Sequence, residues 1–189
     1  MVNNHFNLNY LDFNNFSRSK YWVGYFERKG PFHDDLIDSS IAHVINYLQP
    51  SCSMYITLSA LSYDDEREKD KVINRHYGDI YNKAKSRNLL LSLNKDYESF
   101  LYGESGLSVN NLTLSTNDKF TWNLCRLLMA HGGVLGEVLF IAFISQGIIV
   151  YPHKDTGFGV ISMNSELRPA TEFLSSVALD ERFSIYMPM

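Results

Sequence analysis

Three apolar segments in the last third of the chain constrain the fold more than any other feature. They are VLFIAFI (138–144), IIVYP (148–152) and VISM (160–163), and the polar stretches SQG and HKDTGFG connect them. Short apolar segments separated by turn-forming residues are typical of neighbouring antiparallel strands. The stretch therefore predicts a β-meander.

Helical periodicity occurs elsewhere in the chain, between further candidate strands. Apolar residues at helical spacing, with acids at the start or a proline or glycines at the end, predict four helices. We expect these helices at about residues 34–49, 63–88, 117–131 and 169–179. Residues 21–27, 51–61, 89–93 and 183–187 read as strands, and residues 94–117 as a loop with one or two short strands. We expect Thr116 or Asn117 to cap the third helix.

Helices mixed with hairpins indicate an α+β protein and argue against a doubly wound parallel sheet. We predict one domain over residues 1–189, built on a mainly antiparallel sheet with three to four packed helices. The first twenty residues are rich in Asn, with Phe6, Leu8 and Tyr10 alternating, and they suit an edge strand or an ordered arm.

Composition excludes several classes of protein. The formal net charge of −4 and the lack of a basic stripe argue against nucleic-acid binding. The longest apolar run is too short to cross a bilayer, and the N-terminus lacks the pattern of a signal peptide, so we expect a cytoplasmic protein. Cys52 and Cys125 lie in apolar contexts and are expected to be free thiols, with no disulfide framework.

The cluster His153, Lys154 and Asp155 resembles a catalytic site more closely than any other stretch of the sequence does. A His with an Asp nearby is the pair that general-base catalysis uses. Pro152, Gly157 and Gly159 instead have the residue types that a turn requires, Gly for a positive φ, and no nucleophile is identifiable. We favour the polar tip of a hairpin, which a partner could contact.

Two further His-containing clusters have simpler structural explanations. Residues 131–133, His-Gly-Gly, suit the C-terminal end of a helix, where the helix dipole disfavours an anion; Glu137 follows them. Residues 33–35, His-Asp-Asp, suit a helix N-terminus, and nothing indicates the further ligands that a metal would need. We expect no metal and no cofactor.

The mixed-charge run DDEREKDK (64–71) has its acids first. It reads as the solvated first turns of a helix or, alternatively, as an acidic face for a cationic protein. The acids concerned are Asp64, Asp65, Glu66 and Glu68. Sequence motifs for phosphate loops, dinucleotide binding, nucleophile elbows and zinc proteases are absent, which favours a binding protein over an enzyme.

Residues 117–180 combine an amphipathic helix, an apolar hairpin, the HKDTGFG turn and the closing helix ELRPATEFLSSVAL. In this order of elements the chain resembles the bacterial immunity proteins of contact-dependent growth inhibition and related polymorphic toxin systems. The resemblance implies a non-enzymatic protein that binds a cognate toxin domain, expected to be a basic nuclease, and occludes its active site. The candidate contacts are then the four acids above together with His153, Lys154 and Asp155. The alternative is a small hydrolase or transferase that uses His153 and Asp155, with His131 or Glu137.

Overall fold

A single eight-stranded sheet organises the protein. The computed structural model describes residues 8–67 and 71–188, and within these ranges every strand belongs to this sheet. The strands are β1 (Trp22–Arg28), β2 (Tyr55–Tyr63), β3 (Leu91–Ser92), β4 (Thr113–Thr116), β5 (Val134–Phe143), β6 (Ile148–His153), β7 (Gly157–Ser162) and β8 (Phe183–Tyr186).

The strand order is β3-β2-β5-β6-β7-β1-β8, and β4 also pairs with β2. Every pairing is antiparallel except the short one between β2 and β3. β5, β6 and β7 form the predicted meander, so the fold class and the antiparallel sheet predicted from sequence are confirmed. β8 and β4 lie at opposite edges.

Five α-helices accompany the sheet in the described residues, which is more than the three to four predicted. They are α1 (Asp34–Leu48), α2 (Lys71–Ser86), α3 (Lys95–Leu101), α4 (Thr121–Ala130) and α5 (Arg168–Val177). Short 3₁₀ turns occur at Leu8–Tyr10, Phe16–Arg18 and Val109–Asn111. The described part of the N-terminal segment is thus an ordered arm and contains no strand.

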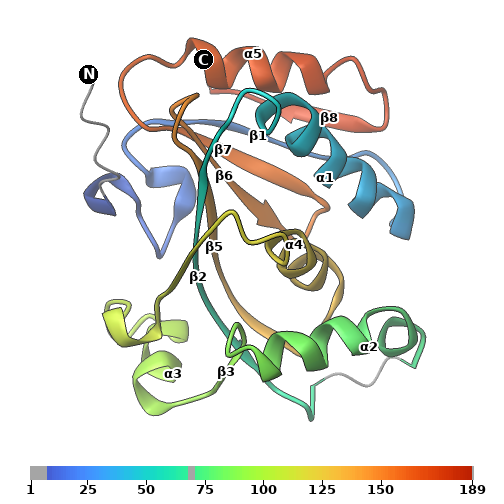
Figure 1. Ribbon diagram of the computed structural model, residues 1–189, viewed down its shortest axis with the longest axis vertical. Coiled ribbons are helices and arrows are strands. Elements are labelled where there is room, and N and C mark those ends of the chain that lie inside the picture. Colours follow the sequence, from blue (N-terminus) through green and yellow to red (C-terminus); the bar gives the residue numbers. More distant parts are fainter. Residues whose placement is uncertain (1–7, 68–70, 189) are drawn as a thin grey trace.

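One face of the sheet is covered by helices. α1, α2, α4 and α5 lie on this side, which we call the helical face (Figure 1). Alternate strand residues such as Phe26, Ile141 and Phe158 point into its core, where Phe173 of α5 also lies. Each of these four side chains is fully buried, so the helical face holds the main hydrophobic core.

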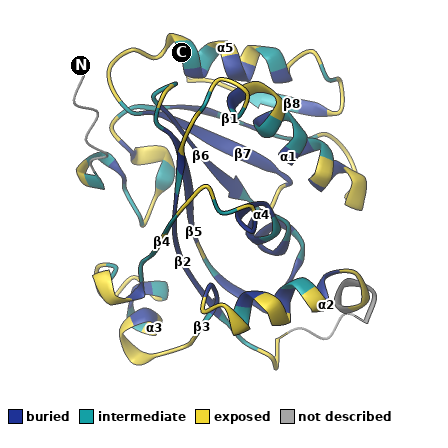
Figure 2. Ribbon diagram, in the orientation of Figure 1, coloured by how far each residue is buried: buried dark blue, intermediate teal, exposed yellow. Residues whose placement is uncertain are grey.

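The opposite face has a smaller cover, made of the N-terminal arm and α3. Phe16 of the arm packs against Phe140, and Tyr97 and Phe100 of α3 join the same cluster. β5, β6 and β7 are therefore buried on both sides, as Figure 2 shows, which explains why their sequences are continuously apolar. We call this the arm face; its cover thins out toward β1 and β8.

Three local predictions were wrong. α3 lies in the segment read as loop, because seven residues with two buried apolar side chains are too few to show a helical period; Asn94 caps it by accepting a hydrogen bond from the Tyr97 amide. α2 begins at Lys71 and not near residue 63. Asp118 accepts from the Phe120 amide at the start of α4, whereas Asn117 bonds to Tyr55.

Candidate functional site

Two glycines of β7 shape the arm face where its cover thins out. Gly159 is paired with Tyr151 of β6 and Tyr25 of β1, and Gly157 is paired with His153. A Cβ atom on Gly159 would overlap the Tyr151 ring, and one on Gly157 would overlap the Phe26 carbonyl. Side chains of β6 can therefore lie across β7 toward β1 only because these positions have no side chain.

The turn between β6 and β7 does not use those glycines as expected. The sequence predicted that Gly157 and Gly159 supply positive φ to the turn, yet both lie within strand β7. Positive φ occurs instead at Thr156, whose φ is 56°. The prediction of a hairpin turn at HKDTGFG is confirmed, and the reason given for its glycines was wrong.

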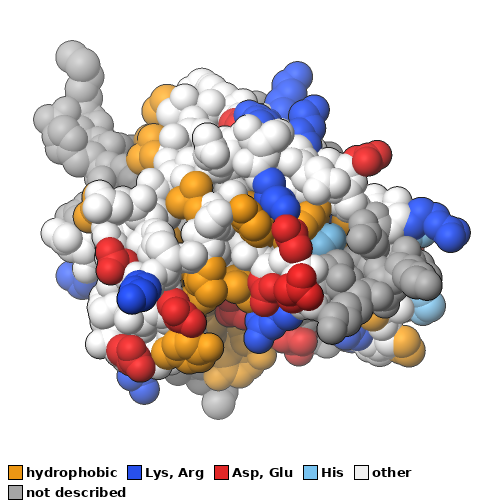
Figure 3. Space-filling model, turned by 90° about the horizontal axis from the view of Figure 1, so that it is seen from below, with side chains coloured by type: hydrophobic (Ala, Val, Ile, Leu, Met, Phe, Trp, Pro, Cys, Tyr) orange, Lys and Arg blue, Asp and Glu red, His pale blue; other side chains and the backbone are white. Residues whose placement is uncertain are grey.

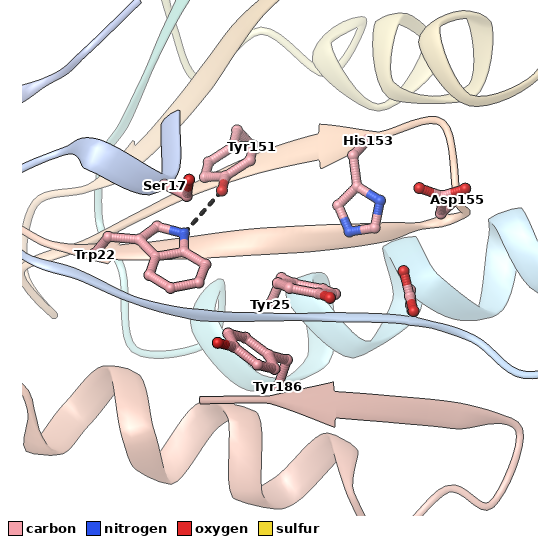
Figure 4. Close-up of a pocket in the computed structure, with 8 residues that line it drawn as sticks. Ser17, Trp22, Tyr25, Tyr151, His153, Asp155 and Tyr186 are labelled. Carbon is pink, nitrogen blue, oxygen red and sulfur yellow. Dashed lines mark hydrogen bonds between the residues drawn. The ribbon is translucent and has the colours of Figure 1, made fainter. Parts of the chain in front are cut away.

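Two contacts connect β6 to β1 across the glycines of β7. Trp22 Nε1 donates a hydrogen bond to the Tyr151 hydroxyl at 2.9 Å (Figure 4). His153 Nε2 lies 3.0 Å from the Phe26 carbonyl oxygen. Because a carbonyl can only accept, Nε2 of His153 carries the proton. Burial lowers the pKa of His153, so its ring is neutral at physiological pH.

Three aromatic rings at the sheet edge, those of Trp22, Tyr25 and Tyr186, are stacked or tilted against one another, and we call this group the platform. The ring centroids of Tyr25 and Tyr186 lie 5.2 Å apart with only 27° between the ring planes. Trp22 lies 6.0 Å from Tyr186 and 6.3 Å from Tyr25, tilted by 39° and 35°. In Figure 4 Tyr25 lies between Tyr186 and His153, so the platform extends from β8 across β1 toward the β6–β7 turn.

These groups surround a cavity of about 460 Å³, which we call the aromatic pocket. Its lining consists of Ser17, Trp22, Tyr25, Glu27, Tyr151, His153, Asp155 and Tyr186. Two of these side chains are carboxylates, and none is Lys or Arg. The pKa of Tyr25 is raised by burial, then by the charge of Glu27, by Tyr186 and by the charge of Asp155. The pocket is thus aromatic and electrostatically negative.

A catalytic arrangement of Ser17, His153 and Asp155 is not assembled in this pocket. The Ser17 hydroxyl donates to the Asn15 side chain at 2.7 Å, and His153 Nε2 is engaged by the Phe26 carbonyl. Neither group is thus poised to activate the other.

The remaining residues of the hydrolase alternative lie outside this pocket. His131 stacks on Tyr81, with ring centroids 4.2 Å apart, and lines a different depression. Glu137 pairs with Lys154 at 2.8 Å. Neither residue lines the pocket that His153 and Asp155 share, although the charge of Glu137 acts on His153 and raises its pKa against the larger effect of burial.

The predicted acidic face is largely engaged in contacts within the chain. Asp65 forms an ion pair with Lys85 at 2.8 Å and accepts from the Tyr81 hydroxyl. The bond to Lys85 is the main cause that lowers the pKa of Asp65. Asp64 accepts a hydrogen bond from the Glu66 amide in a turn ahead of α2 and not in its first turn.

Neighbouring charges also break up that acidic face. Arg67 shares a depression with Asp64, and on the side seen in Figure 3 basic and acidic side chains lie interspersed. Glu68 lies outside the described residues. Among the described residues at the end of the molecule that carries β3 and α2, we find no single acidic field.

The structure therefore divides the predicted contact residues. His153 and Asp155 line the aromatic pocket, whereas Lys154 is paired with Glu137 outside it. The sequence reading missed Trp22, Tyr25, Glu27, Tyr151 and Tyr186, the residues that form most of its walls. The alternation of Tyr25 and Glu27 about the buried Phe26 was the available signal, since such residues share one face of a strand.

The described residues hold no cluster of three or more His, Cys, Asp or Glu side chains arranged to bind a metal ion. Asp34 and Asp35 lie in the first turn of α1, where acidic side chains interact favourably with the helix dipole. Within the described ranges no helix has the length and apolar character needed to span a membrane.

Comparisons with known proteins add no relative. No protein-family model, no curated protein and no solved structure matches the chain.

Proposed function

We propose that the protein is a cytoplasmic, non-enzymatic immunity protein that binds a basic toxin domain, of the nuclease kind, and covers its active site. We further propose that the aromatic pocket is where it holds this partner. The observation that carries the proposal is a negative cavity walled by aromatic rings at the edge of the sheet.

The composition of the pocket suits an anchor point for a protein partner. Tyr and Trp are enriched among the residues that dominate binding energy, because they bury a large rigid surface at a small entropic cost. Tyr186 is 49% exposed and Met187 is 40% exposed. These side chains lie at the β8 edge, where a partner reaches them without rearrangement of the core.

Charge supports the same choice of partner. The chain has a formal net charge of −4, and Glu27 and Asp155 add a local negative potential at the pocket. Opposite charge on a partner accelerates its diffusional encounter and selects against acidic proteins. Asp64 and Glu66 contribute to this long-range attraction in our proposal, whereas the contacts form at the pocket.

The proposal predicts that a basic toxin domain is encoded next to the gene of this chain, and the test uses that domain. We expect the purified protein to form a one-to-one complex with that domain by calorimetry and to abolish its activity. The double variant Tyr25→Ala/Tyr186→Ala should lose at least about 10-fold in affinity, as expected for two aromatic anchors.

Tyr102→Ala serves as the matched control, because Tyr102 is 74% exposed and lies beyond the end of α3, outside the pocket. This control should bind like the wild type. Failure of the wild-type protein to bind or to inhibit the neighbouring toxin domain would reject the proposed function.

A further inference from the structure

We infer that the aromatic pocket is a binding site for a guanidinium group. The side chain of the partner that it accepts is then an arginine, and this part of the inference rests on the proposed function. The chemistry of the pocket itself can be measured without any partner. Three features of its walls lead to this ligand.

The first feature is the near-parallel stacking of the platform rings. Tyr25 and Tyr186 are 27° from parallel, and Trp22 is tilted by less than 40° to either ring. Such stacked rings present near-parallel π-faces, and a planar guanidinium can continue the stack against a ring that faces the cavity. A tetrahedral ammonium is better held by rings that enclose it from several sides.

The second feature is the position of the carboxylates. Glu27 lies two residues after Tyr25 on β1, and Asp155 lies in the β6–β7 turn, and both line the same cavity as the platform. A guanidinium stacked on the rings directs its N–H groups outward in its own plane, where carboxylates at the rim can accept them. A quaternary ammonium has no N–H group to offer.

The third feature is that none of the described residues that line the pocket is a cation. His153 is neutral because burial lowers its pKa, and its Nε2–H is directed to the Phe26 carbonyl. Lys154, the nearest basic residue in the turn, is paired with Glu137 and is absent from the lining. An anionic ligand would face two carboxylates without a compensating charge.

The experiment is a titration followed by the indole N–H resonance of Trp22, which reports on the pocket through its bond to Tyr151. The probes are N-acetyl-arginine amide, its neutral counterpart N-acetyl-citrulline amide, N-acetyl-lysine amide and glucose. We expect saturable shifts with the arginine probe at a Kd on the order of 1–10 mM, weaker binding of the lysine probe, and none with citrulline or glucose.

Variants assign the binding to the proposed walls. Tyr186→Ala, a substitution at an exposed edge position, should weaken the arginine probe about five-fold, and Glu27→Gln by a similar factor. Their matched controls are Tyr102→Ala and Glu172→Gln; Glu172 is 57% exposed on α5, which packs on the helical face. Both controls should titrate like the wild type.

Equal binding of arginine and citrulline probes, saturable binding of glucose, or unchanged binding in Tyr186→Ala would overturn the inference. Its outcome is separable from that of the proposed function. A toxin complex without arginine binding would support the proposed function and reject arginine as the ligand. Arginine binding without a toxin complex would support the ligand and reject the proposed function.

Discussion

The two faces of the sheet are built differently, and the difference separates stability from binding. On the helical face, four helices bury side chains such as Phe26 and Phe173 completely. On the arm face, the N-terminal arm and α3 cover β5 and β6 but stop short of β8. The aromatic residues that the arm and α3 leave uncovered form a pocket that water can enter.

Aromatic residues serve different purposes on the two faces. Phe26 lies in the core of the helical face, and its neighbour Tyr25 lies on the platform of the pocket. Because successive side chains of a strand point to opposite faces, one strand supplies both. The following predictions test this division, from the largest expected effect to the smallest.

Phe173→Ala should lower the free energy of unfolding by about 3–5 kcal/mol, because it removes a fully buried ring from the helical face. Phe16→Ala, on the half-buried arm, should cost about 1–2 kcal/mol, since much of the ring is already near solvent. Urea denaturation measures both. Equal costs would show that the arm face is as tightly packed as the helical face.

Gly159→Ala should cost about 1–3 kcal/mol and should shift the Trp22 indole resonance, because the added methyl group displaces the Tyr151 ring from its partner. Gly106→Ala is the matched control: nothing lies within 4 Å of the added atom and no positive φ is required. That control should be near neutral. An unchanged indole resonance in Gly159→Ala would contradict the role given to this glycine.

Acidification should weaken the fold through His153. Its pKa in the folded protein lies below the ordinary value of 6.5, because burial disfavours the charged ring. Below pH 6.5 the unfolded chain therefore binds a proton that the folded chain does not, and stability falls with pH until the folded pKa is reached.

The His153→Gln variant should remove this component from the pH dependence of unfolding measured between about pH 5 and 7. His33→Gln, at an exposed position, is the control for loss of one imidazole. A wild-type slope in His153→Gln would contradict the assignment.

Tyr186→Ala should change the free energy of unfolding by at most about 1 kcal/mol, because the side chain is half exposed at the end of an edge strand. The same variant should lose partner binding. A large loss of stability would mean that the platform belongs to the core and is not reserved for a ligand.

The sequence predicted the parts of the fold that depend on local periodicity. The meander and four of the helices follow from apolar spacing. The burial of β5 to β7 on both sides was not predicted, although their continuous apolar runs are consistent with it. α3 was missed because its stabilising contacts, through Tyr97 and Phe100, come from a distant part of the chain.

The pocket was harder to predict, because its walls come from β1, β6, the β6–β7 turn and β8. His153 and Asp155 were found because they stand together in sequence, whereas Trp22, Tyr25 and Tyr186 meet only through strand pairing. The acidic run at Asp64 was conspicuous, yet its central member Asp65 is paired with Lys85. Charge proximity in sequence did not indicate which carboxylates remain unpaired in space.

The most direct test of the central claim is calorimetric titration of the cognate toxin domain with two double variants that keep the fold. Tyr25→Ala/Tyr186→Ala removes the platform, and Asp64→Lys/Glu66→Lys reverses the acidic turn. At about 0.15 M salt we expect at least about a 10-fold loss of affinity for the first and less than about a three-fold loss for the second. Tight binding by the platform variant, with loss of binding by the turn variant, would contradict the account.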